Sequence, residues 1–339
     1  MKITKAWEYA EETLDKVSRT FALNIKVLGK KLRKPILLAY LYMRMADTIE
    51  DAPDLSVKEK TLLLQKFSLA VNLGGESIDE FVKALPQSWQ NSGQADRALC
   101  YNAVAVLPLL LEYPEPVANA IRKGVEEMCI GMAEFSKRQE VRTDGWFTIE
   151  SEADLDGYCY FVAGLVGNML TELFCASGKN FDEKRQKKLR ELAVSFGLAL
   201  QLVNIIKDIQ EDSSRKVCFV PMEFCRKHGI NSVQEFFSPE TPQKKKNLAV
   251  GELIQKAARH LQDAKDYIKT LPRLEYRIRL FCLWPSLMAA DNLRVICEGG
   301  TKIARETVKK IIRSTIIFAW SNSWIEKEFA ILIKKKEAT

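Results

Sequence analysis

Apolar residues recur along most of the chain at the three- and four-residue spacing of helix faces, rather than with the alternation of strands. Such a pattern predicts amphipathic α-helices that each bury one face. Only sixteen Gly and eleven Pro interrupt it, and Pro35, Pro116, Pro242 and Pro272 stand where helices are expected to begin. The predicted helices span residues 5–16, 20–28, 35–51, 57–72, 76–84, 95–112, 116–138, 152–178, 182–211, 243–270, 273–298 and 301–335. We predict an all-α protein.

Two stretches break the helical pattern. Residues 212–242, with "SSRKVCFVP" and "KHGINSVQEFFSPETP", predict loops and short helices, and residues 136–146 predict a charged surface loop. Because the first stretch directly follows a run of acidic residues, it is a candidate lid. The chain contains no repeat and no low-complexity linker. We therefore expect a single domain over residues 1–339, with residues 301–339 as a C-terminal helix that can lie at the periphery.

The stretch "NIIKDIQED" (204–212) ends an apolar run with acidic and amide side chains. Asn204, Asp208 and Asp212 follow one another at four-residue intervals, so they share one stripe of a helix. Carboxylates stacked in this way repel one another, and burial makes the repulsion more costly. We therefore expect a positively charged group to lie opposite this stripe.

A second acidic cluster, "DTIED" (47–51), follows the apolar run "LLAYLYMRMA". Asp47, Glu50 and Asp51 again fall on one helix face. Oxygen ligands without nearby Cys or His suit Mg²⁺ (or Mn²⁺) better than zinc. Two such clusters could face each other and hold a diphosphate through bridging metal ions. The alternative, that each is an ordinary solvated helix end, is less favoured because the two clusters share the same spacing and setting.

Basic residues flank both clusters or stand in the motif "VSRTFALNI". These residues are Arg19, Arg44, Lys207, Arg215 and Lys216. They could form plain ion pairs with the acids, or contact phosphate oxygens that the metal ions leave uncovered. In the same motif, Ser18 could also cap a helix.

Aromatic and small residues accompany the acidic clusters. Four tyrosines stand in or beside apolar helical segments, namely Tyr40, Tyr42, Tyr158 and Tyr160. Their ring faces could stabilise a carbocation, although an aromatic stripe is more often part of a core. Gly164 and Gly167 weaken the helix predicted for "YCYFVAGLVGNML". They permit either a close helix crossing or room for a long apolar substrate.

The net charge of +7 is concentrated at the ends, since residues 1–40 and residues 301–339 each carry nine basic and four acidic side chains. Such basic ends fit an anionic membrane or an anionic substrate. Nucleic acid is disfavoured, because no basic patch is interleaved with aromatic residues. The segment "TIIFAWSNSWIEKEFAILIKKK" is expected to lie at a membrane interface or to pack on the protein. The interfacial alternative turns Trp320, Trp324 and Phe329 toward lipid and Lys334–Lys336 toward head groups.

The eight Cys form no C-x-x-C pair, which indicates reduced thiols. The N-terminus lacks the apolar region of a secretion signal, and no apolar run approaches the ~18 residues of a membrane span. We expect a cytoplasmic protein, with peripheral association at the inner face of the membrane as the alternative.

Taken in order, "SRTF", "YLYMRMADTIED", "YCYFVAGLVG" and "LQLVNIIKDIQED" resemble the motifs of the squalene/phytoene synthase family of head-to-head prenyl transferases. The similarity extends from about residue 17 to about residue 300. It implies an isoprenoid synthase fold, a single-domain helical bundle with a central cavity. It also implies that the two acidic clusters face each other and bind Mg²⁺ together with prenyl diphosphates.

Matched position by position, the resemblance assigns metal binding to Asp47, Glu50, Asp51, Asn204, Asp208 and Asp212. It assigns the diphosphate pocket to Ser18, Arg19, Tyr40, Arg44, Gln201 and Lys207, to which we add the neighbouring Arg215. The residue that matches the tyrosine implicated in the first half-reaction is Tyr158. We take it as catalytic, together with Asp47, Asp51, Asp208 and Asp212. Candidates for the phosphates of a nicotinamide nucleotide are Lys302 and Lys216.

Within the family, "FCLWPSLMAADNL" and "GGTKIARETV" are most similar to squalene synthases. Two positions depart from the family pattern. Lys207 stands where Arg is usual, which removes a bidentate fork, and Val217 replaces an Arg commonly found beyond the second acidic motif. No membrane anchor follows the catalytic region, which suggests a bacterial or archaeal type. The string "YCYF" resembles the carotenoid branch, so the prenyl chain length stays open.

The resemblance implies that two molecules of farnesyl diphosphate condense through presqualene diphosphate, and that NADPH then allows formation of squalene. One alternative is a dehydrosqualene or phytoene synthase, which needs no reductant. Another is a non-catalytic relative that acts as a scaffold or assembly factor, which the intact acidic motifs disfavour. No Gly-rich dinucleotide fingerprint stands at a strand–helix junction, so the reductive step has the weaker support.

Overall fold

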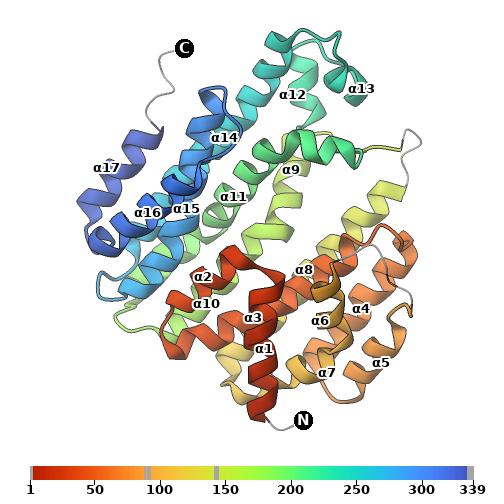
Figure 1. Cartoon of the computed structure of the whole chain (residues 1–339), viewed down its shortest axis with the longest axis vertical. Helices are drawn as coiled ribbons and strands as arrows, with labels where there is room; N and C mark the ends of the chain where they lie inside the picture. The colour runs from red at the N-terminus through yellow and green to blue at the C-terminus, as the bar shows by residue number, and fades with distance from the viewer. Residues whose placement is uncertain (1–2, 88, 90–92, 141–144, 334–339) are drawn as a thin grey trace. The chain divides into compact units, whose positions relative to one another are not determined.

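The computed structural model of the chain describes residues 3–87, 89, 93–140 and 145–333, without the side chains of Arg19, Thr20, Gln139, Glu140 and Ile333. The helices form two compact units, drawn in chain order in Figure 1. The first unit contains Met1–Glu140 and Asn168–Lys179, and the second contains Val141–Gly167 and Asn180–Thr339. The all-α class is confirmed. The single family-type domain over residues 1–339 and its central cavity stay predictions.

The first unit is a helical bundle that includes most of α10. Its elements are α1 (Ile3–Val17), α2 (Arg19–Val27), α3 (Lys30–Glu50), α4 (Val57–Leu73), α5 (Glu76–Ala84), α6 (Gln94–Tyr101), α7 (Ala103–Val106), the 3₁₀ helix η1 (Leu107–Glu112), α8 (Glu115–Glu140) and α10 (Leu165–Ser177). Helix α3 lies in its core, where Leu38, Leu41 and Met45 have no exposed surface. Tyr42 is a core residue as well, and its hydroxyl donates to the Leu107 carbonyl at 2.8 Å.

Two expected features of the first unit are different in the structure. Helix α3 begins at Lys30, so Pro35 lies inside the helix instead of starting it. The buried Leu32 explains the earlier start, because it extends the apolar face of α3 upstream. The helix predicted for residues 95–112 is divided at Asn102 into α6 and α7, and a 3₁₀ helix follows.

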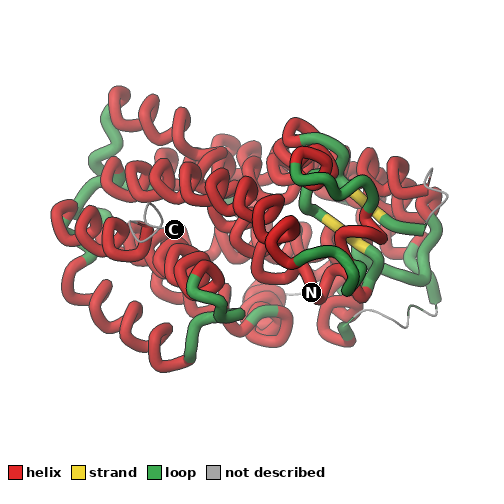
Figure 2. The backbone as a smooth tube through the Cα atoms, turned by 90° about the horizontal axis from the view of Figure 1, so that it is seen from above, coloured by secondary structure: helices red, strands yellow, loops and turns green. Residues whose placement is uncertain are grey.

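The second unit combines long helices with a small parallel sheet. Its elements are β1 (Phe147–Thr148), α9 (Glu152–Cys159), the π-helical turn η2 (Tyr160–Gly164), α11 (Glu183–Ser214), β2 (Val217–Cys218), α12 (Met222–Lys227), α13 (Val233–Phe237), α14 (Gln243–Thr270), α15 (Tyr276–Cys297), α16 (Arg305–Phe318) and α17 (Asn322–Ile333). The two strands pair with Phe147 opposite Val217, as Figure 2 shows in yellow. Residues 215–242 thus hold loops and short helices, as predicted, and in addition one strand, whereas residues 212–214 extend α11 beyond its predicted end.

The turn η2 and the first residues of α10 cross α11 at the distance of direct backbone contact. A Cβ atom placed on Gly167 would lie 1.9 Å from the Ala193 carbonyl oxygen, and one on Gly197 would lie 2.2 Å from the Ala163 oxygen. A Cβ on Gly164 would lie 2.9 Å from a methyl carbon of Leu198. Of the two explanations for Gly164 and Gly167, the close helix crossing is therefore the one that the structure supports.

The predicted C-terminal helix is interrupted at residues 319–321, which separate α16 from α17. The guanidinium of Arg279, which has no exposed surface, lies at this break. It donates from Nε to the Ala319 carbonyl at 2.6 Å, from Nη1 to the Leu271 carbonyl at 2.8 Å, and from Nη2 to Asn322 Oδ1 at 2.6 Å. Burial lowers the pKa of Arg279 to about 10. The bonds to Ala319 and Leu271 satisfy backbone carbonyls that the ends of α16 and α14 would otherwise leave unpaired.

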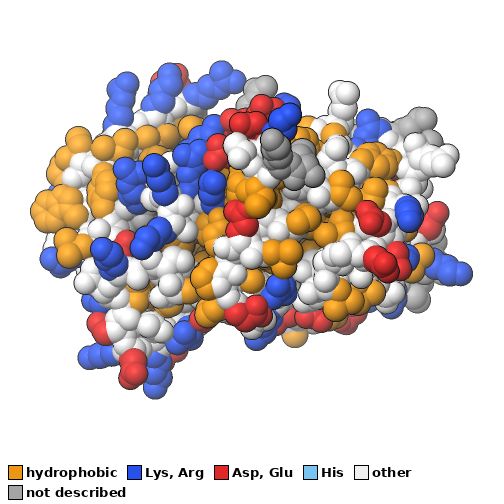
Figure 3. All heavy atoms as spheres, turned by 90° about the horizontal axis from the view of Figure 1, so that it is seen from below, with side chains coloured by type: hydrophobic (Ala, Val, Ile, Leu, Met, Phe, Trp, Pro, Cys, Tyr) orange, Lys and Arg blue, Asp and Glu red, His pale blue; other side chains and the backbone are white. Residues whose placement is uncertain are grey.

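The side chains of α16 and α17 divide between surface and core. Figure 3 shows hydrophobic and basic side chains next to each other on one face of the protein. The exposed large apolar residues between Arg305 and Ile333 are Ile316, Ile317, Phe318, Trp320 and Ile331. The expectation that Phe329 faces lipid is wrong, because Phe329 has no exposed surface. Lys334–Lys336 lie outside the described residues. Membrane association of this segment stays a prediction.

Three described helical segments are long and apolar enough to cross a membrane, judged by length and composition alone. They are Glu152–Ser177, Glu183–Ser214 and Tyr276–Cys297. Between 50% and 61% of their most apolar windows is buried inside the protein, so packing within the protein accounts for much of this apolar character.

We predict that Gly197→Ala destabilises the protein by about 1–3 kcal/mol or more, because the added methyl group overlaps the backbone of residue 163. Urea denaturation measures the change. Gly251→Ala, within α14, is the matched control, because a Cβ atom there meets no atom within 4 Å. The control should gain up to about 1 kcal/mol from helix propensity. Equal effects of the two substitutions would contradict the close crossing.

Candidate active site

Helix α3 presents the first acidic cluster at its C-terminal end. Asp51 caps the helix, and its backbone N–H donates to the Asp47 carbonyl at 2.8 Å. The pKa of Asp47 is raised to about 7, chiefly by burial and then by the charge of Asp51, while Arg44 opposes the shift. The negative end of the helix dipole also disfavours carboxylates here. The surroundings of Asp47 therefore disfavour its charged form, and its role as a metal ligand stays a prediction.

Arg44 has a partner that the sequence did not indicate. Its Nε donates to Asp96 Oδ1 at 2.8 Å, and this hydrogen bond raises the pKa of the guanidinium. Asp96 lies in the first turn of α6, and its side chain is only 14% exposed. An acid in the first turn of a helix is common, so nothing in the sequence distinguished this one.

Ser18 and Tyr40 lie together at the start of α2. Ser18 caps the helix by accepting a hydrogen bond from the Phe21 N–H at 3.2 Å, and the ring of Phe21 stacks on that of Tyr40 with centroids 5.5 Å apart. Burial raises the pKa of Tyr40, while a hydrogen bond with Ser18 opposes the rise. The grouping of Ser18 with Tyr40 therefore fits the predicted pocket. The side chain of Arg19 lies outside the described residues.

The second cluster lies on α11 in the second unit. Lys207 Nζ donates to Asn204 Oδ1 at 3.2 Å and lies 3.3 Å from Asp208 Oδ2. One turn further, Arg215 Nη2 contacts Asp212 Oδ1 at 2.5 Å. Burial raises the pKa of Asp212, Arg215 opposes this shift, and Asp208 adds to it. Lys207 and Arg215 thus each form an ion pair with a carboxylate of the second cluster.

The remaining predicted residues of the second unit stand at separate places. Gln201 is half-buried on α11, shortly before Asn204 in the chain. Lys216 is exposed and follows α11 with a left-handed φ of 57°, and its carbonyl accepts a hydrogen bond from the Phe147 N–H at 2.9 Å. Lys302 is exposed between α15 and α16. The roles of Gln201, Lys216 and Lys302 stay predictions, as does the facing arrangement of the two clusters.

Tyr158 lies on α9 against aromatic residues of the second unit. Its ring stacks on Phe219 with centroids 4.6 Å apart, and Phe147 lies 6.4 Å away. Phe219 directly follows β2, and Phe147 begins β1, so the small sheet places both rings. The π-helical turn η2 begins two residues after Tyr158, a feature that is frequent at functional sites.

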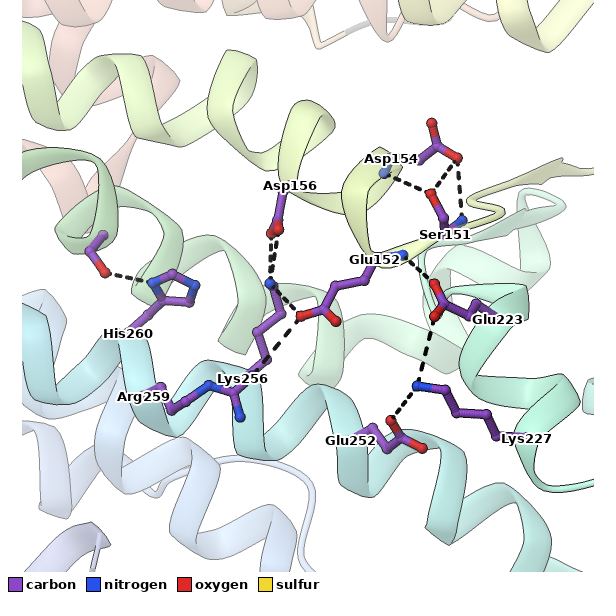
Figure 4. A network of polar contacts seen from close by, with 11 residues as sticks. Ser151, Glu152, Asp154, Asp156, Glu223, Lys227, Glu252, Lys256, Arg259 and His260 are labelled. Atoms are coloured by element: carbon purple, nitrogen blue, oxygen red, sulfur yellow. Dashed lines mark hydrogen bonds and ion pairs between the residues drawn. The ribbon is translucent and has the colours of Figure 1, made fainter.

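A polar network joins α9 to α12 and α14, and Figure 4 shows it from close by. The buried ammonium group of Lys256 lies 2.7 Å from Glu152 Oε1 and 2.8 Å from Asp156 Oδ1. Burial lowers the pKa of Lys256, but its bonds to Asp156 and Glu152 outweigh burial and raise it above the usual value. Sequence analysis missed this network, because Lys256 is about 100 residues from its partners and its helix pattern only marks it as polar.

Two further contacts extend the network in Figure 4. The Glu223 carboxylate of α12 accepts a hydrogen bond from the Glu152 N–H at 3.0 Å, at the N-terminus of α9. Lys227 of α12 lies 3.2 Å from Glu252 of α14. The segment after β2, expected to be a lid, is therefore bound to both helices in this structure.

A cavity of about 1370 Å³ lies within the second unit, beside α11, α13 and α14 and the end of α15. Its basic lining residues are Lys207, Lys246 and Arg259, and no Asp or Glu is among its described lining residues. Ile206 and Gln210 also line the cavity, and they lie about half a turn around α11 from the acidic stripe. Gly299 and Gly300 complete the lining, and Lys302 follows them closely in the chain.

Among the described residues, no group of three or more His, Cys, Asp or Glu side chains is arranged to hold a metal ion by itself. Each acidic cluster, taken within its own unit, is therefore at most part of a metal site. This is compatible with Mg²⁺, which usually binds one or two carboxylates together with water and substrate phosphates.

Comparisons with known proteins agree with the motifs. The sequence model described as squalene/phytoene synthase matches residues 14–311. Squalene synthase of Schizosaccharomyces pombe is 30% identical over 285 residues, which cover 84% of this chain and 58% of the relative. Human squalene synthase is 30% identical over 299 residues, covering 87% of this chain and 64% of the relative. The chain thus spans less than two thirds of the length of these relatives.

Solved structures share the fold. The structure described as TcSQS with the ligand E5700 superposes with a TM-score of 0.81 at 24% identity, covering 98% of this chain and 93% of the other. A dehydrosqualene synthase in complex with ligand gives a TM-score of 0.65 at 16% identity, covering 96% of this chain and 98% of the other. The predicted isoprenoid synthase fold is confirmed.

We predict that His260 makes the protein less stable in mild acid. Burial, followed by the charge of Lys256, lowers the pKa of His260, so between that pKa and the unfolded value of ~6.5 the unfolded chain binds more protons. The free energy of unfolding should therefore fall as the pH drops through this window. In His260→Asn, urea denaturation at a series of pH values should show a smaller fall.

The same substitution at His228, the other histidine of the chain, is the control. It should leave the contribution of His260 in place. If His260→Asn showed the same pH dependence as the wild type, the inferred shift at His260 would be wrong.

Proposed function

Because the chain belongs to the squalene/phytoene synthase family, we propose that it condenses two molecules of farnesyl diphosphate head to head, through presqualene diphosphate, to squalene. The observation that carries this proposal is the pair of helix-borne acidic clusters. Asp47 on α3 lies near Arg44 and Asp51, and Asp208 and Asp212 on α11 lie near Lys207 and Arg215. Each cluster is short of positive charge or of ligands when taken alone.

The donor atoms of both clusters fit Mg²⁺. All are carboxylate or amide oxygens, and the raised pKa of Asp47 indicates a site where added positive charge is favourable. Asp47, Glu50 and Asp51 would bind Mg²⁺ on α3, and Asn204, Asp208 and Asp212 would bind Mg²⁺ on α11. When bound, Mg²⁺ neutralises charge on a diphosphate leaving group.

The basic side chains would bind the phosphate oxygens that remain. Arg44, Lys207 and Arg215 are paired with carboxylates in the protein alone, so a diphosphate can bind by exchanging one anionic partner for another. Lys207 offers a point charge instead of a planar fork, so we expect it to orient the diphosphate less strictly than Arg. Ser18 and Tyr40 would supply hydroxyl groups at the first pocket.

In the proposed reaction, the C1–O bond of one farnesyl diphosphate breaks and its electron pair leaves with the diphosphate. The allylic cation adds to the double bond of the second molecule, and loss of a proton closes the cyclopropane. The Tyr158 hydroxyl is the proposed group for this proton transfer, and it would pass the proton on to the released diphosphate. The stacked rings of Tyr158 and Phe219 also present π faces that favour positive charge.

We propose that the second half-reaction takes a hydride from NADPH, whose phosphates would bind at the cavity of the second unit. The three basic lining residues and the lack of carboxylates among the described lining residues fit a polyanionic nucleotide. Lys302, close in the chain to the lining residue Gly300, could add a further positive charge. Lys216 is not among the described lining residues.

Incubation with farnesyl diphosphate and Mg²⁺, with and without NADPH, tests the proposal. We expect consumption of farnesyl diphosphate in both cases, and squalene only when NADPH is present. Asp47→Asn and Asp208→Asn should each lower turnover by about 100-fold or more, because each removes a charge that would act on the leaving group. Product analysis by mass spectrometry measures the outcome.

Glu191→Gln is the control, because Glu191 is exposed on α11 and forms an ion pair with the exposed Lys188, away from both acidic clusters in the chain. It should keep wild-type turnover. Failure of the wild type to consume farnesyl diphosphate would refute the enzyme proposal, and dehydrosqualene or phytoene formed without NADPH would assign the other branch.

For the reductant, we predict that Lys246→Glu raises the KM for NADPH by about 10-fold, since one charge contact is worth on the order of 1.4 kcal/mol. Consumption of farnesyl diphosphate without NADPH should not change. Lys244→Glu makes the same charge change on the same helix at an exposed residue that is not among the described lining residues. Equal effects of the two variants would argue against nucleotide binding in the cavity.

A further inference from the structure

Lys256 is a buried charge that joins two helices of the second unit. Its side chain is 7% exposed, and its ammonium group lies within 3.0 Å of both Glu152 and Asp156 (Figure 4). Both carboxylates belong to α9, one turn apart, so a single cation joins two successive turns of this helix to α14. Arg259 lies at 4.0 Å from Glu152 on the exposed side.

The opposite face of α9 carries Tyr158. Two residues correspond to about 200° round a helix, so Tyr158 points away from Asp156 and toward Phe219. Helix α9 is thus fixed by ion pairs on one side and by stacked rings on the other. The position of the Tyr158 hydroxyl depends on both.

Helix α9 is the N-terminal part of the helical segment Glu152–Ser177, and η2 interrupts the regular pattern of this segment. The π-helical turn η2 separates α9 from α10, so regular α-helical hydrogen bonds do not fix the axis of α9 relative to that of α10. Its N-terminus is held by the capping box of Ser151 and Asp154 and by the Glu223 carboxylate.

We propose that Lys256 is a positioning residue for Tyr158: it binds Glu152 and Asp156 and so fixes the direction of α9 from which the Tyr158 hydroxyl reaches the reacting substrate. This inference rests on the proposed function for its effect on turnover. Its effect on α9 itself does not depend on that function. Lys256 touches no substrate in this account and acts only through α9.

The test compares Lys256→Met with Lys256→Arg. In Lys256→Met, kcat for consumption of farnesyl diphosphate should fall by about 10- to 100-fold with an unchanged KM, because a misplaced group affects the chemical step. Lys256→Arg keeps the positive charge and should therefore retain most of the wild-type kcat. Combined with Tyr158→Phe, Lys256→Met should add no further loss, because both changes act on one group. An additive loss would overturn the proposal.

Hydrogen exchange gives a readout that is independent of turnover. The amides of α9 should exchange about 10-fold faster in Lys256→Met, while the amides of α11 keep their wild-type rates. Lys265→Met is the matched control, because Lys265 is also buried on α14 but pairs with Glu326 at 2.5 Å. The control should leave α9 protection and kcat unchanged. Uniformly faster exchange in Lys256→Met would mean a general loss of stability and would overturn the proposal.

If Lys256→Met does not fold, the double variant Glu152→Gln/Asp156→Asn removes the same ion pairs from the α9 side and must give the same results. Wild-type protein that leaves farnesyl diphosphate unchanged would refute the proposed function alone. The exchange comparison would still decide whether Lys256 fixes α9.

Discussion

The backbone contact of η2 and the start of α10 with α11 is the constraint on which the second unit depends. Gly167 and Gly197 remove the two Cβ atoms that would separate the segments, and the carbonyl groups of Ala193 and Ala163 occupy the space. The contact fixes the chain that follows Tyr158 directly onto the helix that carries Asp208. A side chain at either glycine would move a candidate catalytic tyrosine and a candidate metal ligand together.

The buried carboxylates, by contrast, lower the stability of the protein. Burial raises the pKa of both Asp47 and Asp212, so neither carboxylate is stabilised by the fold that holds it. Basic partners compensate for part of this cost in each unit. Binding sites commonly retain such destabilising groups, because the ligand supplies the missing interaction. The stability of the chain therefore does not explain the acidic clusters, whereas the proposed binding of cations would explain them.

Much of this arrangement could be predicted from the sequence, because it is local. Helical periodicity indicated the all-α class, and four-residue spacing placed Asn204, Asp208 and Asp212 on one helix. The contacts that depend on distant segments could not be found in this way. Asp96 meets Arg44, and Lys256 meets Asp156, only after the chain has folded. Pro35 does not mark the start of α3, because the buried Leu32 extends the apolar face of the helix upstream.

Arg279 changes how the end of the chain should be regarded. Two of its three described hydrogen bonds go to residues beyond position 318, and α17 also supplies Glu326 to Lys265 and Lys269. Deleting α17 would remove Asn322 and Glu326, so the buried Arg279 would lose one of its three hydrogen bonds and the buried Lys265 would lose its ion pair with Glu326. Helices α16 and α17 thus contribute to the folding of the second unit. Shortened versions of the protein would therefore report on its folding as much as on any contact with lipid.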